Sequence, residues 1–450
     1  MSRIRIIITI IVVVLTTLLT GCTGKEPNEI AYVVALGIDS TDDDNYKITI
    51  QYANTTQISG GASESGGKAG SEIVDNVTIE APNIYAGVGL ANNIVSKSFS
   101  MSHAKLIVFS KEIAEKGVKD MIETLVRSEE IRPDVFIAVA NTTANDYLTS
   151  VNPEMEVNPA QYYQLIYQKN QLVGIPDGQL REFFTGLYTD NYDSILPVAG
   201  VIEGAGGNSQ NDDKGQSKDG QNEGSEGSSE SLDSFESKSS NEKDENEKEK
   251  DAEKNTSKYE YDIKNYIGGE TTIEKKNKAE AIGAAVFEKD KMVGELGEVE
   301  TEICKMLKGD YTYSYLTYYN NDTPDIPITV KTTQQKKPKY KIDTDKKTVD
   351  IELYIESDLY SLPADYNVEN KIEDFERDVA NYTSSACTEF INNFTKKYNS
   401  DILKLNEKVK YKFLTNNQYN WFKKNVGWSE YKFSVCTNFK VRRTGLIVRE

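Results

Sequence analysis

The fold of the first part of the chain is built on one apolar segment, Ile30-Ala31-Tyr32-Val33-Val34-Ala35-Leu36-Gly37-Ile38. This short apolar run is rich in Val, Ile and Tyr and has a glycine near its end, which is typical of a buried β-strand. A polar turn at residues 39–45 follows, and residues 46–52 then alternate apolar and polar side chains. The two segments predict an antiparallel hairpin with one face open to solvent.

Helical and extended patterns alternate after this hairpin. They predict the following elements: helices at residues 82–98 and 118–127, and strands at 106–109 and 135–139. Ser110 can cap a short helix that Gly117 ends. This alternation predicts a first α/β domain at residues 22–150.

A middle domain is expected at residues 151–335. Its ordered parts are predicted as helices at 160–169, 180–188 and 301–308 and strands at 196–202, 281–288 and 291–294. Residues 204–257 are almost entirely Gly, Ser, Asn, Asp, Glu, Gln and Lys. Such a composition buries too little apolar surface to fold, so we expect a disordered acidic insert. The alternative for this insert is a segment that binds a partner.

A C-terminal α/β domain is predicted at residues 336–450. Residues 348–356 and 431–441 alternate like strands, and residues 421–428 suggest an aromatic connector. A long helix at 372–398 has one apolar stripe, formed by Phe375, Val379, Tyr382, Ala386, Phe390 and Phe394. The sequence as a whole therefore predicts a mixed α/β (α+β) protein with three sheet-based domains.

The N-terminus has the pattern of a leader at residues 1–21. Arg3 and Arg5 precede an apolar run that is short for a membrane span, and Leu19-Thr20-Gly21-Cys22 follows. This motif resembles a bacterial lipobox, which implies cleavage between Gly21 and Cys22, a diacylglycerol group on the sulfur of Cys22 and an acylated amino group. An ordinary secretory signal and an uncleaved anchor helix are the alternatives.

Composition limits the kinds of partner. The chain has 450 residues and a net charge of -19, and no later run approaches the length of a membrane span. The excess of acidic residues argues against nucleic acid as a partner, because phosphate binding needs clustered Lys and Arg. It argues equally against a body that lies flat on anionic lipid.

Motifs for catalysis or cofactor binding are missing from the sequence. There is no P-loop, nucleophile elbow or paired-carboxylate motif, so we expect no cofactor and no enzymatic activity. Gly87-Val88-Gly89 lies in a helical pattern and is interpreted as a helix-packing site, with a dinucleotide site as the alternative. A zinc site is not expected, because His103 is the only histidine and no ligand pair has metal spacing.

Several single residues have two interpretations each. His103 is interpreted as a hydrogen-bonded structural residue, with a general base as the alternative. Arg442 and Arg443 are interpreted as surface charges at the end of a strand, with carboxylate binding on another protein as the alternative. Three cysteines remain after Cys22: Cys304, Cys387 and Cys436. Because three is an odd number, they are interpreted as small core residues, with one disulfide as the alternative.

Five short stretches, taken in order, resemble the Ger(x)C lipoproteins, the C subunits of spore germinant receptors. All five follow the lipobox. Residues 29–39 match the family's first strand, which ends in "GID", residues 102–107 its "GHAKVI" region, and residues 130–133 its "EIR" step. Residues 283–294 match its "GTAVFKDDKLVG" hairpin, and residues 441–445 its "IRRTG" terminus. The chain departs from the pattern in three places. The acidic insert at 204–257 is longer than the family core needs. Thr23-Gly24 replaces the Trp-Asp that usually follows the lipid cysteine, and Ser102 replaces a glycine.

The resemblance implies a three-domain mixed α/β protein on the outer face of the spore inner membrane. It implies action beside the A and B membrane subunits of a nutrient germinant receptor. Cys22 is the only site residue that the resemblance carries over from the family to this chain. From the sequence we therefore expect a lipid-anchored, non-catalytic assembly or signal-coupling subunit. Two alternatives are a solute-binding lipoprotein of a membrane transporter and an anchored hydrolase of the cell wall.

Overall fold

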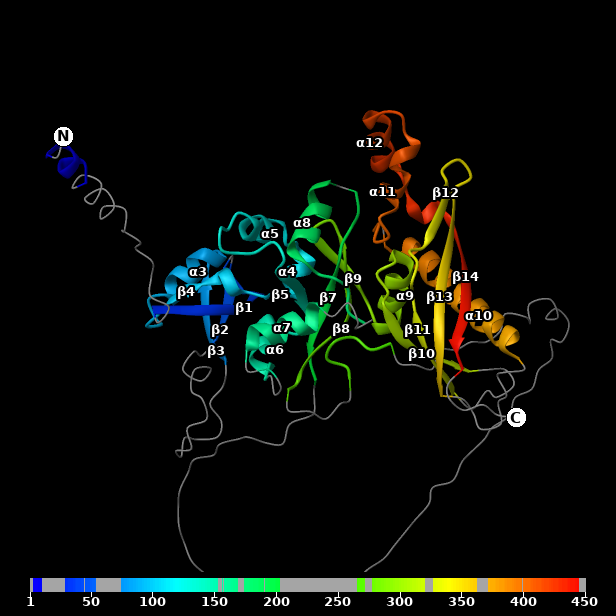
Figure 1. Ribbon diagram of the computed structural model, residues 1–450, viewed down its shortest axis with the longest axis horizontal. Coiled ribbons are helices and arrows are strands. Elements are labelled where there is room, and N and C mark those ends of the chain that lie inside the picture. The colour runs from blue at the N-terminus through cyan, green and yellow to red at the C-terminus, as the bar shows by residue number, and fades with distance from the viewer. Residues whose placement is uncertain are drawn as a thin grey trace, which may run out of the picture. The chain divides into compact units, whose positions relative to one another are not determined.

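The computed structural model describes residues 3–9, 29–43, 45–53, 74–152, 156, 158–168, 174–189, 191–202, 265–271, 277–319, 327–361, 371–398 and 400–444 (Figure 1). The mixed α/β class is confirmed within these ranges, and the described strands form two sheets where three were expected. Cys22 and the acidic insert at 204–257 lie outside the described residues. No helix in the described ranges is both long and apolar enough to span a membrane.

Sheet 1 is a nine-stranded sheet with the order β3-β2-β1-β5-β6-β7-β8-β9, and β4 pairs with β1 beside β5. Its strands are β1 (Ile30–Ser40), β2 (Tyr46–Ala53), β3 (Val74–Ala81), β4 (Ser98–Ser100), β5 (Leu106–Ser110), β6 (Phe136–Ala140), β7 (Ile195–Val201), β8 (Ala279–Glu288) and β9 (Lys291–Leu296). The central strands β1, β5, β6 and β7 are parallel, and antiparallel pairs flank them on both sides. The predicted first hairpin, β1 with β2, is confirmed.

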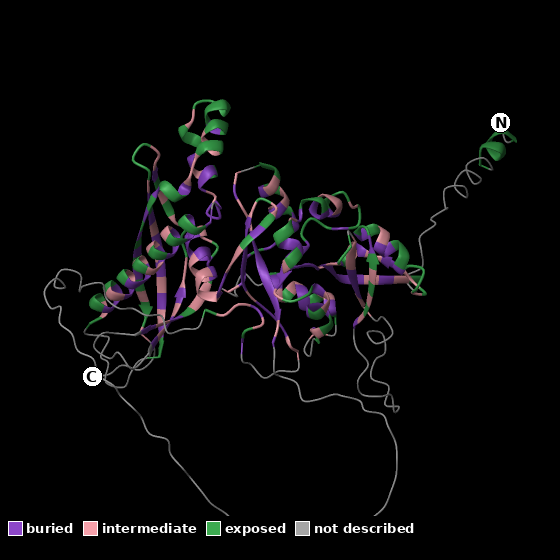
Figure 2. Cartoon of the chain, turned by 180° about the vertical axis from the view of Figure 1, so that it is seen from behind, coloured by how far each residue is buried: buried purple, intermediate pink, exposed green. Residues whose placement is uncertain are grey.

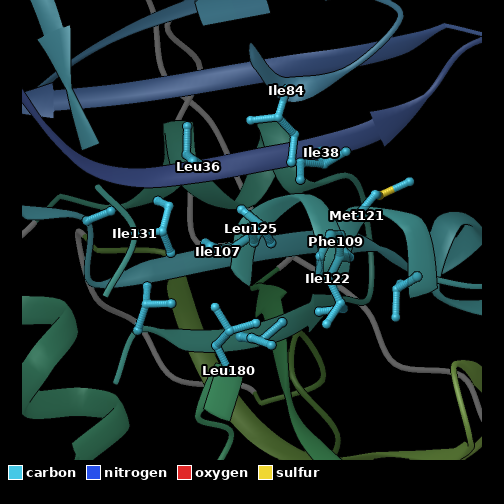
Figure 3. Packing of buried hydrophobic residues seen from close by; sticks show 14 of the residues in the cluster. Leu36, Ile38, Ile84, Ile107, Phe109, Met121, Ile122, Leu125, Ile131 and Leu180 are labelled. Carbon is cyan, nitrogen blue, oxygen red and sulfur yellow. The ribbon is translucent and has the colours of Figure 1, made fainter. Parts of the chain in front are cut away.

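Helices pack on both faces of sheet 1. One hydrophobic cluster joins the sheet to α3 (Ile84–Ala91), α4 (Lys111–Lys116), α5 (Lys119–Val126) and α8 (Leu180–Thr189). Figure 3 shows this packing, with Leu36 and Ile107 of the sheet among side chains from α3 and α5. A second cluster joins the other face to α6 (Ala144–Ser150) and α7 (Pro159–Gln168).

This second layer of helices makes one prediction about the first hairpin wrong. Thr49 and Gln51 are polar residues on the face of residues 46–52 that the alternation predicts to be open to solvent, yet both are fully buried. The amide of Gln51 donates to the carbonyl of Leu148 at 2.8 Å and accepts from the Tyr163 hydroxyl at 2.5 Å. Because α6 and α7 supply partners for these polar groups, the strand can bury both of its faces.

Local signals placed several other elements correctly. The Ser110 hydroxyl caps α4, and Gly117 ends it with a φ of 125° that favours glycine. The helix expected at residues 82–98 is shorter, because α3 ends at Ala91 and the chain re-enters the sheet as β4. The sequence patterns did not predict β3, α6 or the strand β10 (Tyr313–Tyr319).

Sheet 2 has five strands: β10 (Tyr313–Tyr319), β11 (Pro327–Thr333), β12 (Lys339–Asp343), β13 (Thr348–Ser361) and β14 (Lys432–Arg443). Its order is β10-β11-β13-β12, with β14 parallel to β13. The long helix α10 (Ile372–Lys397) confirms the predicted apolar stripe, because Phe375, Val379 and Phe390 are buried. One face of sheet 2 therefore packs on α10, and the other is polar.

The two sheets share a hydrophobic core. One cluster contains Ile195 and Val286 of sheet 1, Ile351 and Phe433 of sheet 2, and residues of α9 (Glu298–Lys308). A Cβ added at Gly294 of β9 would overlap the ring of Tyr398 at the end of α10. Strands expected in the first and middle domains thus lie in one sheet, while the residue boundaries 22–150, 151–335 and 336–450 stay predictions.

The segment between α10 and β14 is helical. It contains α11 (Leu405–Val409), η3 (Lys410–Lys412), α12 (Asn416–Asn425) and η4 (Trp428–Glu430). The predicted aromatic connector at 421–428 is therefore wrong in its first half, where Thr415 caps a ten-residue helix by accepting from the N–H of Gln418. Figure 1 shows α12 beyond the ends of the neighbouring strands, and Figure 2 shows it largely exposed.

Candidate functional site

A polar cavity of about 520 Å³ lies where α8 and the β8–β9 turn meet α12 and η4. Tyr192 and Trp428 form part of its wall. Its charged lining residues are Asp193, Glu288, Lys289, Asp401, Lys423 and Lys424. The cavity therefore brings together segments that are more than 200 positions apart in the sequence.

Two aspartates tie these segments together. The carboxylate of Asp401 accepts from the backbone N–H groups of Leu405 and Asn406, both at 2.8 Å, and so starts α11. The N–H of Asp401 donates to Asp193 at 2.8 Å. The other oxygen of Asp193 accepts from the N–H of Lys289 in the β8–β9 turn at 2.9 Å. Asp193 and Asp401 are therefore a junction between the two halves of the molecule.

Burial changes the acidity of this junction. It raises the pKa of Asp401 to about 7, even though two backbone N–H groups stabilise the ionised form. The neighbouring charge of Asp193 adds to the rise, and burial raises the pKa of Asp193 itself. Burial also lowers the pKa of Lys408, which faces the same carboxylate. The junction can therefore take up or release a proton near neutral pH.

Aromatic and cationic side chains brace the cavity. Lys404 forms an ion pair with Glu182 at 2.7 Å and lies 4.2 Å from the centre of the Tyr192 ring. The indole N–H of Trp428 donates to Asn406 at 3.2 Å. Lys423 donates to the carbonyl of Thr189 at 3.0 Å, which connects α12 with the end of α8. These contacts hold α11 and α12 against sheet 1.

The arrangement has the chemistry of a structural junction. The lining residues include no Ser, Cys or His side chain that could serve as a nucleophile or its base. The carboxylates of Asp193 and Asp401 accept hydrogen bonds from backbone groups. Among the described residues, no group of three or more His, Cys, Asp or Glu has the geometry to hold a metal ion.

None of the candidate site residues predicted from the sequence lines this cavity. His103 is exposed, with its ring 4.8 Å from that of Tyr32 and its Nδ1 3.0 Å from the Ser102 hydroxyl. Arg442 forms an ion pair with Glu356 at 2.8 Å, while Arg443 lies exposed at the end of β14. Cys22 is outside the described residues.

The interpretations of the cysteines and of the glycine pair can be compared with the structure. The cysteines at 304, 387 and 436 are free; the first two are buried core residues as expected, and Cys436 is exposed. Gly87 packs so closely that an added Cβ would lie 2.6 Å from Ile48, which confirms it as a packing site. Gly89 faces open space.

Sequence reasoning missed Asp193 and Asp401. A local signal existed for Asp401, since an aspartate a few residues before Leu405-Asn406-Glu407-Lys408 fits the start of a helix. No sequence signal pairs it with Asp193, which is 208 positions away.

Comparison with known proteins identifies the relatives of this chain. The family model described as the spore germination protein N-terminal domain matches residues 24–201, and the model described as "Spore germination B3/ GerAC like, C-terminal" matches residues 282–445. Most of the β8–β9 hairpin falls in the second match, although the hairpin completes the sheet of the first.

Individual relatives are distant. Spore germination protein KC of Bacillus subtilis (strain 168) is 26% identical over 176 residues, covering 36% of this chain and 43% of that protein. Spore germination protein B3 of the same organism is 26% identical over 31% of this chain and 36% of that protein. The alignments thus span less than half of the length of these relatives.

A solved structure titled "Crystal Structure of the GerBC protein" has 15% sequence identity and a TM-score of 0.48, over 90% of this chain and 96% of that one. Together, the two family models cover most of the chain in the order that the family's domains require. The chain therefore belongs to the Ger(x)C family of spore germination proteins.

Proposed function

We propose that this chain is the lipid-anchored C subunit of a nutrient germinant receptor. In this proposal Cys22 holds the body on the outer face of the spore inner membrane, beside the A and B membrane subunits. The body assembles the receptor or couples its signal, and performs no catalysis.

The position of the lipobox carries the proposal. The first family domain begins at residue 24, two positions after Cys22. An acylated cysteine at that position would tether the domain directly to the membrane. Each buried methylene contributes ~0.8 kcal/mol, so a thioether-linked diacylglycerol with a further acyl chain gives a stable anchor.

The architecture is consistent with coupling. Sheet 1 and sheet 2 share one hydrophobic core, and the Asp193–Asp401 junction adds hydrogen bonds between their loops. A force applied at one sheet is therefore transmitted to the other through packed side chains.

Replacing the lipid cysteine tests the proposal. In Cys22→Ala, the protein should leave the membrane fraction and germination in response to nutrients should slow. The matched control is Cys436→Ala, which removes an exposed free cysteine from β14 and should leave both unchanged. Normal membrane association of Cys22→Ala, judged by fractionation of spore lysates, would contradict the proposal.

The cavity favours a second candidate, a solute-binding lipoprotein. Its volume of about 520 Å³ is within the range of small-molecule sites, and its wall has both aromatic and charged groups. Calorimetric titration of the purified chain with a panel of amino acids and sugars tests this candidate. Saturable binding that is lost in Tyr192→Ala would favour it over a pure coupling role.

A further inference from the structure

The segment at residues 404–424 is basic in an otherwise acidic chain. It contains α11, η3 and all but the last residue of α12. The segment has a single acidic residue, Glu407, and six lysines: Lys404, Lys408, Lys410, Lys412, Lys423 and Lys424. The chain as a whole has a net charge of -19, so this local excess is opposite in sign to the average.

The same segment exposes the most accessible large apolar side chains of the described residues. Leu414 is 95% exposed, Tyr411 is 78% exposed and Trp421 is 68% exposed. We call these three side chains, together with the exposed lysines Lys410 and Lys424, the basic-aromatic tip.

The tip is held in place by a buried base. The rings of Phe413 and Phe422 lie 4.9 Å apart, so their sequence neighbours Leu414 and Trp421 flank one ring pair. Tyr419 is buried beneath them and donates its hydroxyl to the carbonyl of Asn406 at 3.1 Å. The exposed side chains are thus presented by an ordered support (Figure 2).

We propose that the basic-aromatic tip docks on the anionic headgroup surface of a phospholipid membrane. Trp and Tyr are suited to the membrane interface, where their rings are buried and their polar atoms stay hydrated. A leucine at the end of a loop adds apolar area, and neighbouring lysines attract anionic headgroups. The positive charge alone would also suit an acidic protein, but the exposure of three large apolar side chains in the same lysine-rich segment favours lipid.

This proposal departs from the expectation that the acidic composition keeps the body away from anionic lipid. At physiological ionic strength the Debye length is about 8 Å, so acidic residues elsewhere on the body are largely screened at the tip. Lys412 is a weaker contributor, because it donates to the carbonyl of Ile342 and faces Asp343. The contact needs no acyl chain and therefore goes beyond the proposed anchor.

Vesicle binding by a chain that lacks the leader and Cys22 tests the proposal. Residues 23–450 keep every member of the three hydrophobic clusters, whose first residue is Ala31, and a cooperative melt checks that this form is folded. The vesicles used in the test contain either phosphatidylglycerol and phosphatidylcholine in equal parts or phosphatidylcholine alone. We expect cosedimentation with the anionic vesicles only, and weaker binding at high salt.

Tryptophan fluorescence locates the contact. The chain has two tryptophans, and Trp428 is only 7% exposed, so a blue shift with vesicles reports on Trp421. Brominated lipid should quench this emission, and Trp421→Phe should remove the response.

Charge variants complete the test. The double variant Lys410→Gln/Lys424→Gln should weaken binding about thirtyfold, since each lysine near an anionic surface contributes about fivefold. The control Lys116→Gln/Lys119→Gln removes the same charge from α4 and α5 and should change binding by less than about twofold.

Absent binding to anionic vesicles would overturn the proposal, and so would binding that Leu414→Ser/Trp421→Ser leaves unchanged. If the partner of the tip is an acidic protein, binding to anionic vesicles should be absent. Because the test omits Cys22, its failure does not affect the proposed anchor, and failure of the Cys22→Ala experiment does not affect the tip.

Discussion

Sheet 1 and sheet 2 bury their strands in different ways. Every residue of β5 and β6 in sheet 1 is buried, because helices cover both faces. In sheet 2, β14 alternates between buried and exposed residues over most of its length, since only one face packs on α10. The difference shows where the molecule can meet a partner: the central strands β5 and β6 of sheet 1 have no free face, whereas sheet 2 presents a polar surface to solvent.

A charge in the centre of sheet 1 should have the largest effect. Val108 of β5 is fully buried in the cluster that faces α6 and α7. Val108→Asp should destabilise the fold by about 5 kcal/mol or more, because an unpaired carboxylate loses its hydration there. Circular dichroism melts of the purified chain would measure the loss.

The matched change in sheet 2 is Asn438→Lys on the solvated face of β14. Asn438 donates to Glu352 at 3.0 Å, and a lysine can replace that hydrogen bond with an ion pair. The change in stability should stay within about 0.5 kcal/mol. Equal damage from both substitutions would show that the sheets are not buried differently.

Truncation of the core beneath sheet 2 should have the next largest effect. Phe433 of β14 is almost completely buried in the cluster that includes α10. Phe433→Ala should cost about 3–5 kcal/mol through lost burial and the remaining cavity. Chemical denaturation gives this value, and a loss below about 1 kcal/mol would mean that this face of sheet 2 is also open.

The junction between the sheets should make stability depend on pH. The folded-state pKa of Asp401 is about 7, above its ordinary value of 3.8, so the folded protein keeps a proton that the unfolded chain releases. Stability from this group is therefore present at low pH and is lost as the pH rises from about 4 to about 7, by up to about 4 kcal/mol.

The variant Asp401→Asn isolates this titration. It should be less stable than the parent at about pH 5, because one N–H of α11 loses its acceptor at a cost of about 1–3 kcal/mol. The difference should shrink or reverse by about pH 7.5, since Asn does not ionise. A difference that stays constant from pH 5 to 7.5 would contradict the assigned pKa.

Deletion of residues 210–255 should have the smallest effect. The matched family domains end at 201 and resume at 282, so the deleted residues belong to neither. We expect the melting temperature to change little, as measured by calorimetry. Loss of a cooperative transition would show that the insert supports one of the sheets.

Local patterns predicted much of the fold. β1 and β5 are continuous apolar runs and β14 alternates, so burial on two faces or on one was visible in the sequence. The buried amide of Gln51 was not, because its partners Leu148 and Tyr163 come from helices about 100 positions away. The second half of α12 was mistaken for part of a connector, because the helix is mostly polar and Tyr419 is its one buried residue.

The candidate site was less predictable than the fold. The Asp193–Asp401 junction depends on contact across 208 positions, and no local motif encodes that distance. The basic-aromatic tip was present in the sequence as clustered lysines, but its significance depends on the exposure of Leu414 and Trp421.

Copurification of the intact complex tests the central proposal most directly. An affinity tag placed within residues 204–257 avoids both matched family domains. Isolated from spore inner membranes in mild detergent, the tagged chain should bring two integral membrane proteins with it, in amounts that fall in Cys22→Ala. Recovery of the chain alone from membranes that contain it would contradict its assignment as a receptor subunit.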